Sequence, residues 1–323
     1  MNTLKDIKLA QERLCGVAVR TLLMPFPLSD EEKGQEGRLL YLKPENLQPI
    51  GAFKLRGAYN KIASLTPEER LRGVVAYSSG NHAQGVAYAA RSLGVKAVIV
   101  MPEDAPAVKL EATQGLGAEL VLVGPGSDER KARAEELAAQ RGYVVVPPYN
   151  DEQIIAGQGT MGLEILEDLP EVETVMVPVG GGGMLSGVAA AIKLSNPSVK
   201  VIGVEPELAA DAQASLREGR IVQLGADKVT RTLADGLRTQ SIGAINFEYM
   251  KAYVDDIVTV SEDEIQEAML RLAANPKTVA EPSGAVAVAG FLFRREQLPK
   301  NRVHAAVISG GNVEPEMLKR LRA

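Results

Sequence analysis

Short runs of β-branched residues alternate along the chain with longer Ala-rich stretches whose apolar positions recur at helical spacing. This alternation predicts an α/β fold in which parallel sheets are covered by helices. In such folds, ligands bind at the carboxyl ends of strands, where loops lead into helices. The runs typical of strands are Leu39–Leu42, Val74–Ser78, Ala97–Met101, Glu119–Val123, Val144–Val146, Val175–Val179, Val199–Val204, Asp256–Val260 and Val303–Ile308. The clearest amphipathic stretches between them are Gln84–Leu93, Asp128–Gln140 and Met184–Leu194.

The same pattern predicts two domains. Pro147-Pro148 follows a strand, and the segment Asn150–Gly159 then indicates a crossing back to a different sheet. We therefore predict a small domain of residues 73–149, inserted into a large domain made of residues 1–72 and 150–323. The 323 residues of the chain are enough for two such domains sharing a cleft.

Charge and hydropathy argue against two classes of partner. The net charge is −5, and no stripe of Lys and Arg interleaved with aromatic residues occurs, so a nucleic-acid surface is not expected. The N-terminal segment MNTLKDIKLAQERL is charged throughout and lacks the apolar centre of a signal peptide. The longest apolar run, Gly284–Phe293, is about half of what a membrane-spanning helix requires. We expect a cytoplasmic protein.

Cys15 is the only cysteine, which excludes an internal disulfide and a cysteine-rich zinc site. Because it lies on an apolar-periodic stretch near the N-terminus, we expect a small packed side chain rather than a nucleophile.

The loop Gly180–Gly183 follows an apolar strand, and Met184 begins the helix after it. Consecutive glycines let backbone N–H groups and a helix N-terminus approach an anion, so the loop predicts a phosphate site. It is not a dinucleotide fingerprint, because Leu185 or Ser186 stands where the third glycine belongs. A Walker A loop is excluded because the chain has no Gly-Lys dipeptide. The alternative is a tight turn without a ligand.

Lys54 lies in the apolar segment Gly51–Tyr59, next to Phe53 and Leu55. Most lysines are solvated surface charges, and that is the alternative here. An apolar setting would lower the pKa of the lysine amine and allow it to form a Schiff base.

Two further segments follow strands. Ser78–Gly85 offers Ser, Asn and backbone N–H groups to a carboxylate or a phenolate oxygen, although Ser79 could simply cap the following helix. His82 alone would more often be a packed or capping histidine than a catalyst. Ser309–Asn312 is by itself only a turn signal.

Taken together and in this order, the segments around Lys54, Asn81, Gly180–Gly183 and Ser309 resemble the fold-type-II pyridoxal-phosphate enzymes, whose architecture is that of tryptophan synthase β. Within them the match is to serine/threonine dehydratases and the related serine racemases, and it runs from Leu4 to the end. Cysteine synthases share the fold, but their lysine and asparagine motifs differ from FKLRGA and SSGNHA. Further matching motifs are Ile155–Thr160, Leu233–Gly236, Val254–Ile257 and Glu281–Gly284.

The resemblance implies a role for each of these residues. Lys54 would hold pyridoxal 5′-phosphate as a Schiff base and remove the α-proton of the substrate. The other cofactor contacts would come from Phe53 on the pyridine face, Asn81 on the phenolate oxygen, Gly180, Gly181, Gly182, Gly183 and Met184 on the phosphate, and Ser309 on the ring nitrogen. Ser78, Asn81 and His82 are candidates for the substrate carboxylate.

The implied reaction is β-elimination, which converts L-threonine or L-serine to the 2-oxo acid and ammonia. A serine hydroxyl at the ring nitrogen cannot protonate it as a carboxylate would, so a long-lived carbanion is less favoured and elimination suits the site. Glu205, the Ala209 carbonyl and Asp211 match the spacing at which related enzymes bind Mg²⁺ or Ca²⁺, and oxygen ligands suit such ions. An acidic helix N-terminus is the alternative for these residues.

Several alternatives stay open. Ser79 stands where serine racemases keep a second acid/base serine, but dehydratases frequently carry serine there too. A serine, aspartate or threonine racemase with side dehydratase activity, or a 3-hydroxyaspartate ammonia-lyase, is therefore the nearest competitor. A catalytically idle phosphate or nucleotide sensor is disfavoured by the intact Lys54. The chain ends soon after Ser309–Asn312, so feedback inhibition through an appended regulatory domain is not expected. A homodimer is expected, and nucleotide activation is left undecided.

Overall fold

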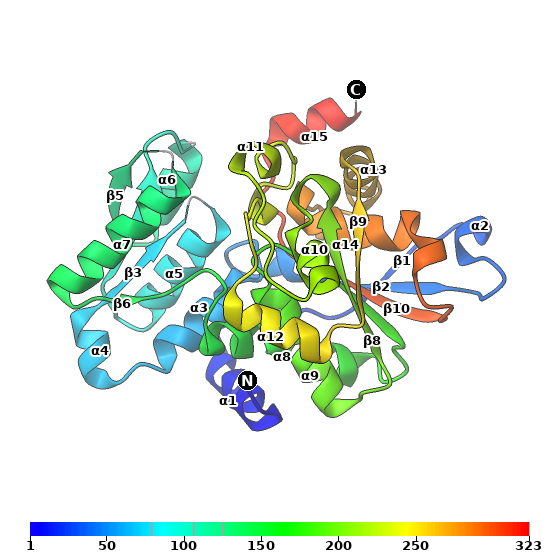
Figure 1. Cartoon of the computed structure of the whole chain (residues 1–323), viewed down its shortest axis with the longest axis horizontal. Coiled ribbons are helices and arrows are strands. Elements are labelled where there is room, and N and C mark those ends of the chain that lie inside the picture. Colours follow the sequence, from blue (N-terminus) through cyan, green and yellow to red (C-terminus); the bar gives the residue numbers. More distant parts are fainter. Residues whose placement is uncertain (79, 106, 125, 323) are drawn as a thin grey trace.

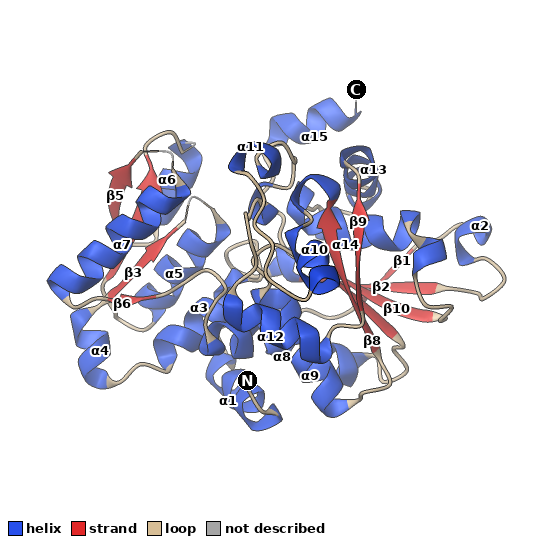
Figure 2. Ribbon diagram, in the orientation of Figure 1, coloured by secondary structure: helices blue, strands red, loops and turns tan. Residues whose placement is uncertain are grey.

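The computed structural model of the chain describes residues 1–78, 80–105, 107–124 and 126–322. Its strands form two sheets, which are well separated in Figures 1 and 2. The strands are β1 (Met24–Phe26), β2 (Leu39–Pro44), β3 (Val74–Tyr77), β4 (Ala97–Pro102), β5 (Glu119–Val123), β6 (Val144–Val145), β7 (Thr174–Pro178), β8 (Lys200–Pro206), β9 (Asp256–Val260) and β10 (Val303–Ile308). The large sheet has the order β1-β2-β10-β7-β8-β9, and the small sheet has the order β5-β4-β3-β6.

Helices connect most of these strands, and several begin with a capping box in which a Ser or Thr side chain and an acidic side chain satisfy the first N–H groups. The α-helices are α1 (Leu4–Leu14), α2 (Asp30–Lys33), α3 (Lys54–Ala63), α4 (Pro67–Arg72), α5 (Asn81–Ser92), α6 (Ala107–Gly115), α7 (Ser127–Arg141), α8 (Glu152–Asp168), α9 (Gly183–Ser195), α10 (Asp211–Glu218), α11 (Ala226–Val229), α12 (Ala244–Tyr253), α13 (Glu262–Leu272), α14 (Pro282–Phe293) and α15 (Pro315–Arg322). Single 3-10 turns are η1 (Glu45–Leu47), η2 (Glu207–Ala209), η3 (Asp235–Leu237), η4 (Pro276–Thr278) and η5 (Arg295–Gln297).

The predicted α/β class with parallel sheets is confirmed. Neighbouring strands in both sheets run parallel, except that β1 pairs antiparallel with β2 at an edge of the large sheet. The sequence pattern did not predict β1, because it has only three residues and prolines at positions 25 and 27 interrupt any strand pattern. The small sheet is built entirely from residues 74–145, within the segment expected to form the inserted domain.

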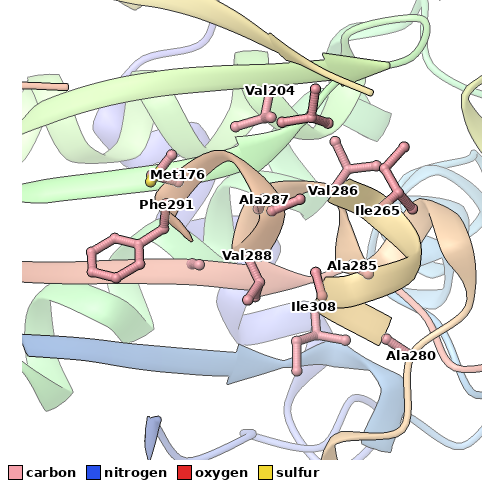
Figure 3. Packing of buried hydrophobic residues seen from close by; sticks show 14 of the residues in the cluster. Met176, Val204, Ile265, Ala280, Ala285, Val286, Ala287, Val288, Phe291 and Ile308 are labelled. Atoms are coloured by element: carbon pink, nitrogen blue, oxygen red, sulfur yellow. The ribbon is translucent and has the colours of Figure 1, made fainter. Parts of the chain in front are cut away.

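Side chains alternate between two apolar layers on each sheet. In the small sheet, Val74 and Ala76 face α3 and α5, whereas Val75 faces α7. In the large sheet, one layer packs against α8, α9 and α12, and the other packs against α13 and α14. Figure 3 shows the second layer, in which Val286 and Phe291 of α14 lie over the strands. Burial on both faces explains why the strands read as continuous apolar runs.

Helix α8 links the two sheets, and its glycines allow it to lie close to its neighbours. The crossing expected over Asn150–Gly159 is made by the first turns of this helix. A Cβ on Gly157 would lie 2.7 Å from the Arg56 carbonyl oxygen of α3, and one on Gly159 would lie 2.9 Å from the Gly187 carbonyl oxygen of α9. These two glycines therefore fix the distances of α3 and α9 from α8, and both of those helices begin at the site described below.

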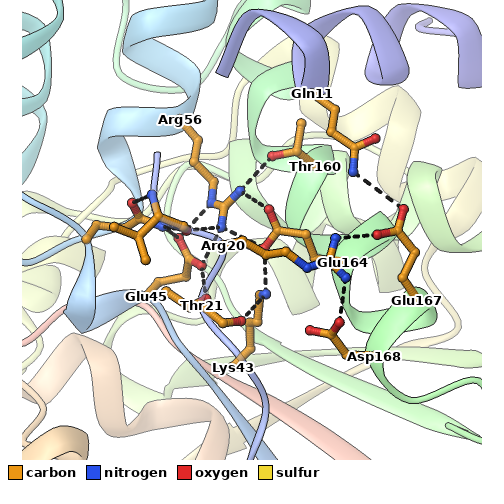
Figure 4. Close-up of polar contacts among 12 residues, drawn as sticks. Gln11, Arg20, Thr21, Lys43, Glu45, Arg56, Thr160, Glu164, Glu167 and Asp168 are labelled. Atoms are coloured by element: carbon orange, nitrogen blue, oxygen red, sulfur yellow. Dashed lines mark hydrogen bonds and ion pairs between the residues drawn. The ribbon is translucent and has the colours of Figure 1, made fainter. Parts of the chain in front are cut away.

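A buried ionic cluster anchors α3 from beneath (Figure 4). Arg56 donates Nε to Glu45 at 2.8 Å and Nη1 to Glu164 of α8 at 2.7 Å. Glu164 also pairs with Lys43 of β2, and the Nζ–Oε2 distance is 2.5 Å. All four side chains are at most 7% exposed. Because each charge has partners of opposite sign, the cluster holds α3 in one position despite the cost of desolvation.

The exposure of Cys15 differs from what the sequence pattern predicts. Cys15 directly follows α1 and is exposed, so the prediction of a packed cysteine was wrong. It fails because α1 ends at Leu14 and the apolar face of the helix does not continue past that residue.

Within the described ranges, no helix is both long enough and apolar enough to cross a membrane.

Candidate active site

A cavity of about 620 Å³ lies between the two sheets and is lined by residues from both. It opens at the carboxyl ends of β3, β7 and β10, as expected for ligand sites in parallel sheets. The described residues predicted for cofactor and substrate that line it are Phe53, Lys54, Ser78, Asn81, His82, Gly180, Gly181, Gly182, Gly183, Met184 and Ser309. Ser79, the predicted second acid/base, lies outside the described residues.

Lys54 is the first residue of α3, and its side chain reaches into the cavity. Its Nζ donates a hydrogen bond to the Pro148 carbonyl oxygen at 2.8 Å and has no carboxylate partner among the described residues. Burial lowers the pKa of the Lys54 amine to about 8. Lys43, by contrast, is completely buried but is paired with Glu164. The fold therefore removes the Lys54 amine from water without placing a described carboxylate beside it.

The glycine loop connects β7 to α9, whose first residue is Gly183. Gly182 has a φ of +94°, in the left-handed region that favours glycine. A Cβ on Gly181 would lie 2.3 Å from the ring of Tyr149, so this glycine is also required for packing. Because residues 180–183 are all glycines, the loop adds no side chains to the cavity. It presents the N-terminal N–H groups of α9 instead. That arrangement fits the phosphate of a cofactor.

Ser309 lies directly beside the Lys54 segment. Ala52 and Gly310 form an antiparallel bridge, and the Phe53 N–H donates to the Ser309 carbonyl oxygen at 3.0 Å. The Ser309 side chain is 3% exposed, and its hydroxyl donates to the Ser283 carbonyl oxygen at 3.3 Å. The end of β10 is therefore fixed against the start of α3.

Asn81 belongs to a hydrogen-bond network that sequence reasoning missed. Its Nδ2 donates to Glu281 Oε1 at 2.7 Å, and its Oδ1 accepts from Asn312 Nδ2 at 2.7 Å. Burial, and then the neighbouring charge of Asp235, raise the pKa of Glu281 to about 8. Glu281 stands in one of the matching motifs, but nothing in that motif indicates its contact with Asn81, because 200 residues separate them.

His82 is buried in the first turn of α5, and its Nε2 lies 2.9 Å from the Val146 carbonyl oxygen. A carbonyl can only accept, so Nε2 carries the proton of the neutral ring. Burial and the charge of Lys54 lower the pKa of His82 to about 3, which keeps the ring neutral. This packed arrangement is the role expected for a lone histidine.

Ser78 accepts a hydrogen bond from the Gly80 N–H at 3.2 Å, and Gly80 is the residue that precedes α5.

Lys109 and Asp235 also line the cavity and were not predicted. Lys109 belongs to α6, beside the small sheet, and Asp235 to the turn η3 of the large-sheet unit. Their Nζ and Oδ2 atoms are 3.1 Å apart, so an ion pair crosses the cavity from one unit to the other. Since each residue looks like an ordinary surface charge in the sequence, only the fold reveals the pair.

The two predicted carboxylate ligands of the metal lie near enough for the charge of Asp211 to act on Glu205. Glu205 ends β8 and accepts the backbone N–H groups of Ala212 and Gln213 at 3.0 and 2.8 Å. Asp211 begins α10, and among the described residues neither of its buried carboxyl oxygens has a partner with hydrogen-bond geometry, although the backbone N–H groups of Asp211 and Ile242 are near enough to lower its pKa. Burial raises the pKa of both carboxyls, and the pKa of Asp211 reaches about 7. No group of three His, Cys, Asp or Glu with metal-ligand geometry occurs in the described part of the chain.

Two carboxylates and a backbone carbonyl are nevertheless a donor set that fits a hard divalent cation. Ala209, whose carbonyl is the third predicted ligand, lies between them in η2 and is fully buried. The unpartnered oxygens of Asp211 are the structural observation that agrees with an ion at this position.

Comparison with known proteins identifies the family of the chain. Residues 17–310 match the family described as pyridoxal-phosphate dependent enzymes. The chain belongs to this family, as the ordered motifs indicated. It is 51% identical over 321 residues to an L-threonine ammonia-lyase of Thermotoga maritima, covering 99% of this chain and 78% of that protein.

Two further relatives carry different names. An L-threo-3-hydroxyaspartate ammonia-lyase of Saccharomyces cerevisiae is 41% identical over 312 residues, which cover 97% of this chain and 94% of that one. The solved structure of maize serine racemase superposes with a TM-score of 0.92 at 36% identity, covering 98% of this chain and 96% of that one. The same fold and cofactor family therefore include lyases and a racemase.

Proposed function

We propose that this protein is an ammonia-lyase that converts L-threonine, and also L-serine, to the corresponding 2-oxo acid and ammonia by β-elimination. The observation that carries the proposal is the placement of Lys54, an amine with no carboxylate partner among the described residues, in one cavity with the glycine loop. Similarity to the Thermotoga maritima L-threonine ammonia-lyase over 99% of the chain supports threonine as substrate.

The described residues fit pyridoxal phosphate. Lys54 would hold the cofactor covalently, Gly180–Met184 its phosphate, Asn81 its phenolate oxygen, and Ser309 its ring nitrogen, with Phe53 against the ring. When bound, the cofactor withdraws electrons from the substrate Cα and makes its proton acidic.

Lys54 supplies the base in this proposal. Because its pKa is about 8, its amine can take up and release a proton near neutral pH, whereas an ordinary lysine stays protonated. His82 stays neutral at that pH and cannot act as a second cationic acid. Ser309 presents an uncharged hydroxyl, which does not hold a proton on the ring nitrogen. With a hydroxyl rather than a carboxylate at this position, the bound cofactor would withdraw electrons less strongly, which would favour β-elimination over reactions that need a longer-lived charge at Cα.

Racemisation and elimination from 3-hydroxyaspartate are the alternatives favoured by the maize and yeast relatives. The deciding experiment incubates the cofactor-loaded enzyme with L-threonine, L-serine and L-threo-3-hydroxyaspartate. Release of 2-oxo acid and the chirality of the remaining amino acid are followed together. We expect the highest kcat/KM for 2-oxobutyrate release from L-threonine. Interconversion of L- and D-serine faster than pyruvate release would overturn the proposal.

A Ser79→Ala variant separates the two chemistries further. If Ser79 is the acid/base on the substrate face opposite Lys54, the variant loses racemisation and all action on D-serine. Elimination from L-threonine needs only Lys54 and should survive at a reduced rate. Even the loss of a helix cap costs only about 1 kcal/mol, so removal of this one hydroxyl should leave the protein folded. Unchanged racemisation in the variant would exclude Ser79 from this role.

We also propose that Glu205, the Ala209 carbonyl and Asp211 bind Mg²⁺ or Ca²⁺. The buried, unpartnered oxygens of Asp211 support this assignment. Addition of Mg²⁺ to metal-free protein should raise its melting temperature, because an ion that binds only the folded state stabilises it. Asp211→Asn should abolish that increase, while the control Glu171→Gln, at an exposed position, should keep it. An equal increase in both variants would refute the site.

A homodimer in the cytoplasm completes the proposal. The exposed free thiol of Cys15 suits a reducing compartment. Val19 and Leu22 are 46% and 68% exposed, and the Val19 N–H is hydrogen-bonded to Gln48, next to the exposed Leu47. An apolar surface of this kind suits self-association. Sedimentation equilibrium of the purified protein tests it, and a monomer at all concentrations would contradict it.

A further inference from the structure

A second cavity of about 190 Å³ lies at the far end of α14 from the candidate active site. Residues 281 and 283 at the start of α14 line the first cavity, whereas Phe291 and Leu292 near its end line the second. The two cavities have no lining residue in common. Besides Phe291 and Leu292, the second is lined by Glu31, Glu32, Arg38 and Arg295.

Arg38 is the central group of this cavity. Its side chain is 5% exposed, its Nη2 donates to the Phe291 carbonyl oxygen at 3.1 Å, and its guanidinium carbon lies 3.9 Å from the centroid of the Phe291 ring. A guanidinium has five N–H donors, and only one of them has a partner here among the described residues. Arg38 lines the cavity, so its remaining donors are available to a ligand there.

The carboxylates around Arg38 are engaged elsewhere or exposed. Glu32 pairs with Arg271 and accepts the Ser29 N–H at 2.8 Å. Glu36 pairs with Arg295 at 2.6 Å. Glu31 is exposed.

Arg295 adds a second positive charge to the same wall. The absence of a side chain at Gly34 leaves room for it, since a Cβ there would lie 1.8 Å from Arg295 Nη2. Burial, and then the charge of Arg295, lower the pKa of Arg38 to about 10, so Arg38 still carries its charge near neutral pH. The charges of Glu36 and Glu32 offset this effect only in part, because each carboxylate already forms an ion pair with another arginine, and an anion in the cavity would give Arg38 a direct partner.

We propose that this cavity binds a small oxyanion, a phosphate or a carboxylate, on the guanidinium of Arg38. The planar fork of an arginine matches both groups through two parallel hydrogen bonds. A space of about 190 Å³ accommodates a ligand of a few non-hydrogen atoms, since one water takes about 30 Å³ in the liquid. A nucleotide is too large for it. The aromatic face of Phe291 fixes the plane of the guanidinium and thereby prepares the fork.

The test is titration calorimetry of the cofactor-loaded enzyme with inorganic phosphate and, separately, with formate. We expect saturable binding of at least one of them, which also identifies the ligand class. Arg38→Met should weaken that binding by at least about tenfold, because it removes a charge-assisted contact. Arg38 does not line the first cavity, so binding of either anion there should be unchanged in this variant. Binding that is lost in the variant therefore takes place in the second cavity.

A second variant changes the affinity in the opposite direction and does not rely on removing a buried side chain. Glu36→Gln removes the partner of Arg295, which leaves a second guanidinium for the anion, and binding should become tighter. Glu218→Gln breaks a comparable exposed pair with Arg220, whose N–O distance is 2.5 Å, and should change nothing. The proposal is overturned if neither anion binds, if Arg38→Met binds as the wild type does, or if Glu36→Gln leaves the affinity unchanged.

Discussion

Asn81 donates a hydrogen bond to Glu281 across 2.7 Å, and this contact joins the start of α5 on the small sheet to the start of α14 on the large one. Glu281 is 5% exposed, and its pKa is raised to about 8, chiefly because it is buried. The carboxyl therefore holds its proton through most of the neutral range, where an ordinary glutamate with a pKa of 4.5 is ionised. The stability of the protein depends on pH through this group.

We expect the contribution of Glu281 to the free energy of unfolding to fall as pH rises from about 5 to 8. In that window the unfolded chain releases the Glu281 proton while the folded chain keeps it, so rising pH favours the unfolded state. The slope contributed by this one group is at most about 1.4 kcal/mol per pH unit. Glu281→Gln keeps an acceptor for Asn81 but cannot ionise, so its stability should depend less on pH. Urea unfolding at pH 5, 6.5 and 8 measures the difference, and parallel curves for the two proteins would contradict it.

Lys54→Ala should abolish the visible absorbance of covalently held cofactor and lower turnover by at least about a thousandfold. The fold should survive, because among the described residues the amine has only the Pro148 carbonyl as hydrogen-bond partner, and its removal relieves a desolvation cost. Lys61→Ala is the matched control on the same helix, since Lys61 forms an ion pair with Asp151 outside the cavity lining. Normal absorbance and turnover in Lys54→Ala would show that the cofactor is held by another group.

Gly181→Ala should weaken cofactor binding. The new Cβ would lie 2.3 Å from the Tyr149 ring, and the loop must shift to relieve the clash. Overpacking of this kind costs about 1–3 kcal/mol, which corresponds to a loss of affinity of roughly ten- to a hundredfold. Gly115→Ala is the control, because a Cβ there meets nothing within 4 Å. Fluorescence titration of the cofactor-free protein with pyridoxal phosphate gives both affinities, and equal values would argue against the loop as phosphate site.

Arg56→Met should destabilise the protein by about 3–5 kcal/mol, because Glu45 and Glu164 would remain buried without their shared cation. Arg20 is 45% exposed and pairs with Glu167 and Asp168, so Arg20→Met should cost less than Arg56→Met, about 1 kcal/mol. Chemical denaturation of both variants provides the comparison. Similar losses in the two would mean that the buried cluster is energetically equivalent to a surface pair.

Much of the fold could be predicted from the sequence, because buried parallel strands and amphipathic helices leave strong local patterns. The predicted ranges 119–123, 256–260 and 303–308 agree with β5, β9 and β10 to the residue. The edge strand β1 left no such pattern, since it is short and its prolines read as a loop. The exposure of Cys15 depends on where α1 ends, which an apolar period does not determine.

The site residues that could be predicted are those whose role shows within one short segment of the sequence. The glycine loop and Lys54 are local motifs, and the cavity brings them together with Asn81 and Ser309. The pairing of Glu281 with Asn81 could not be found in the same way, because distant parts of the chain create it. The Pro148 carbonyl that accepts from Lys54 is a backbone group, which no residue type reveals.

The position of β10 in the large sheet has a consequence for how the protein is made. β10 is the last strand of the chain, yet it lies between β2 and β7. During synthesis the small sheet is complete once residue 145 has left the ribosome, whereas the large sheet keeps a gap until residues 303–308 emerge. Until then the edges of β2 and β7 stay unpaired, and Ser309 has not joined Lys54. The nascent chain can therefore assemble its cofactor pocket only after residues 303–309 have left the ribosome.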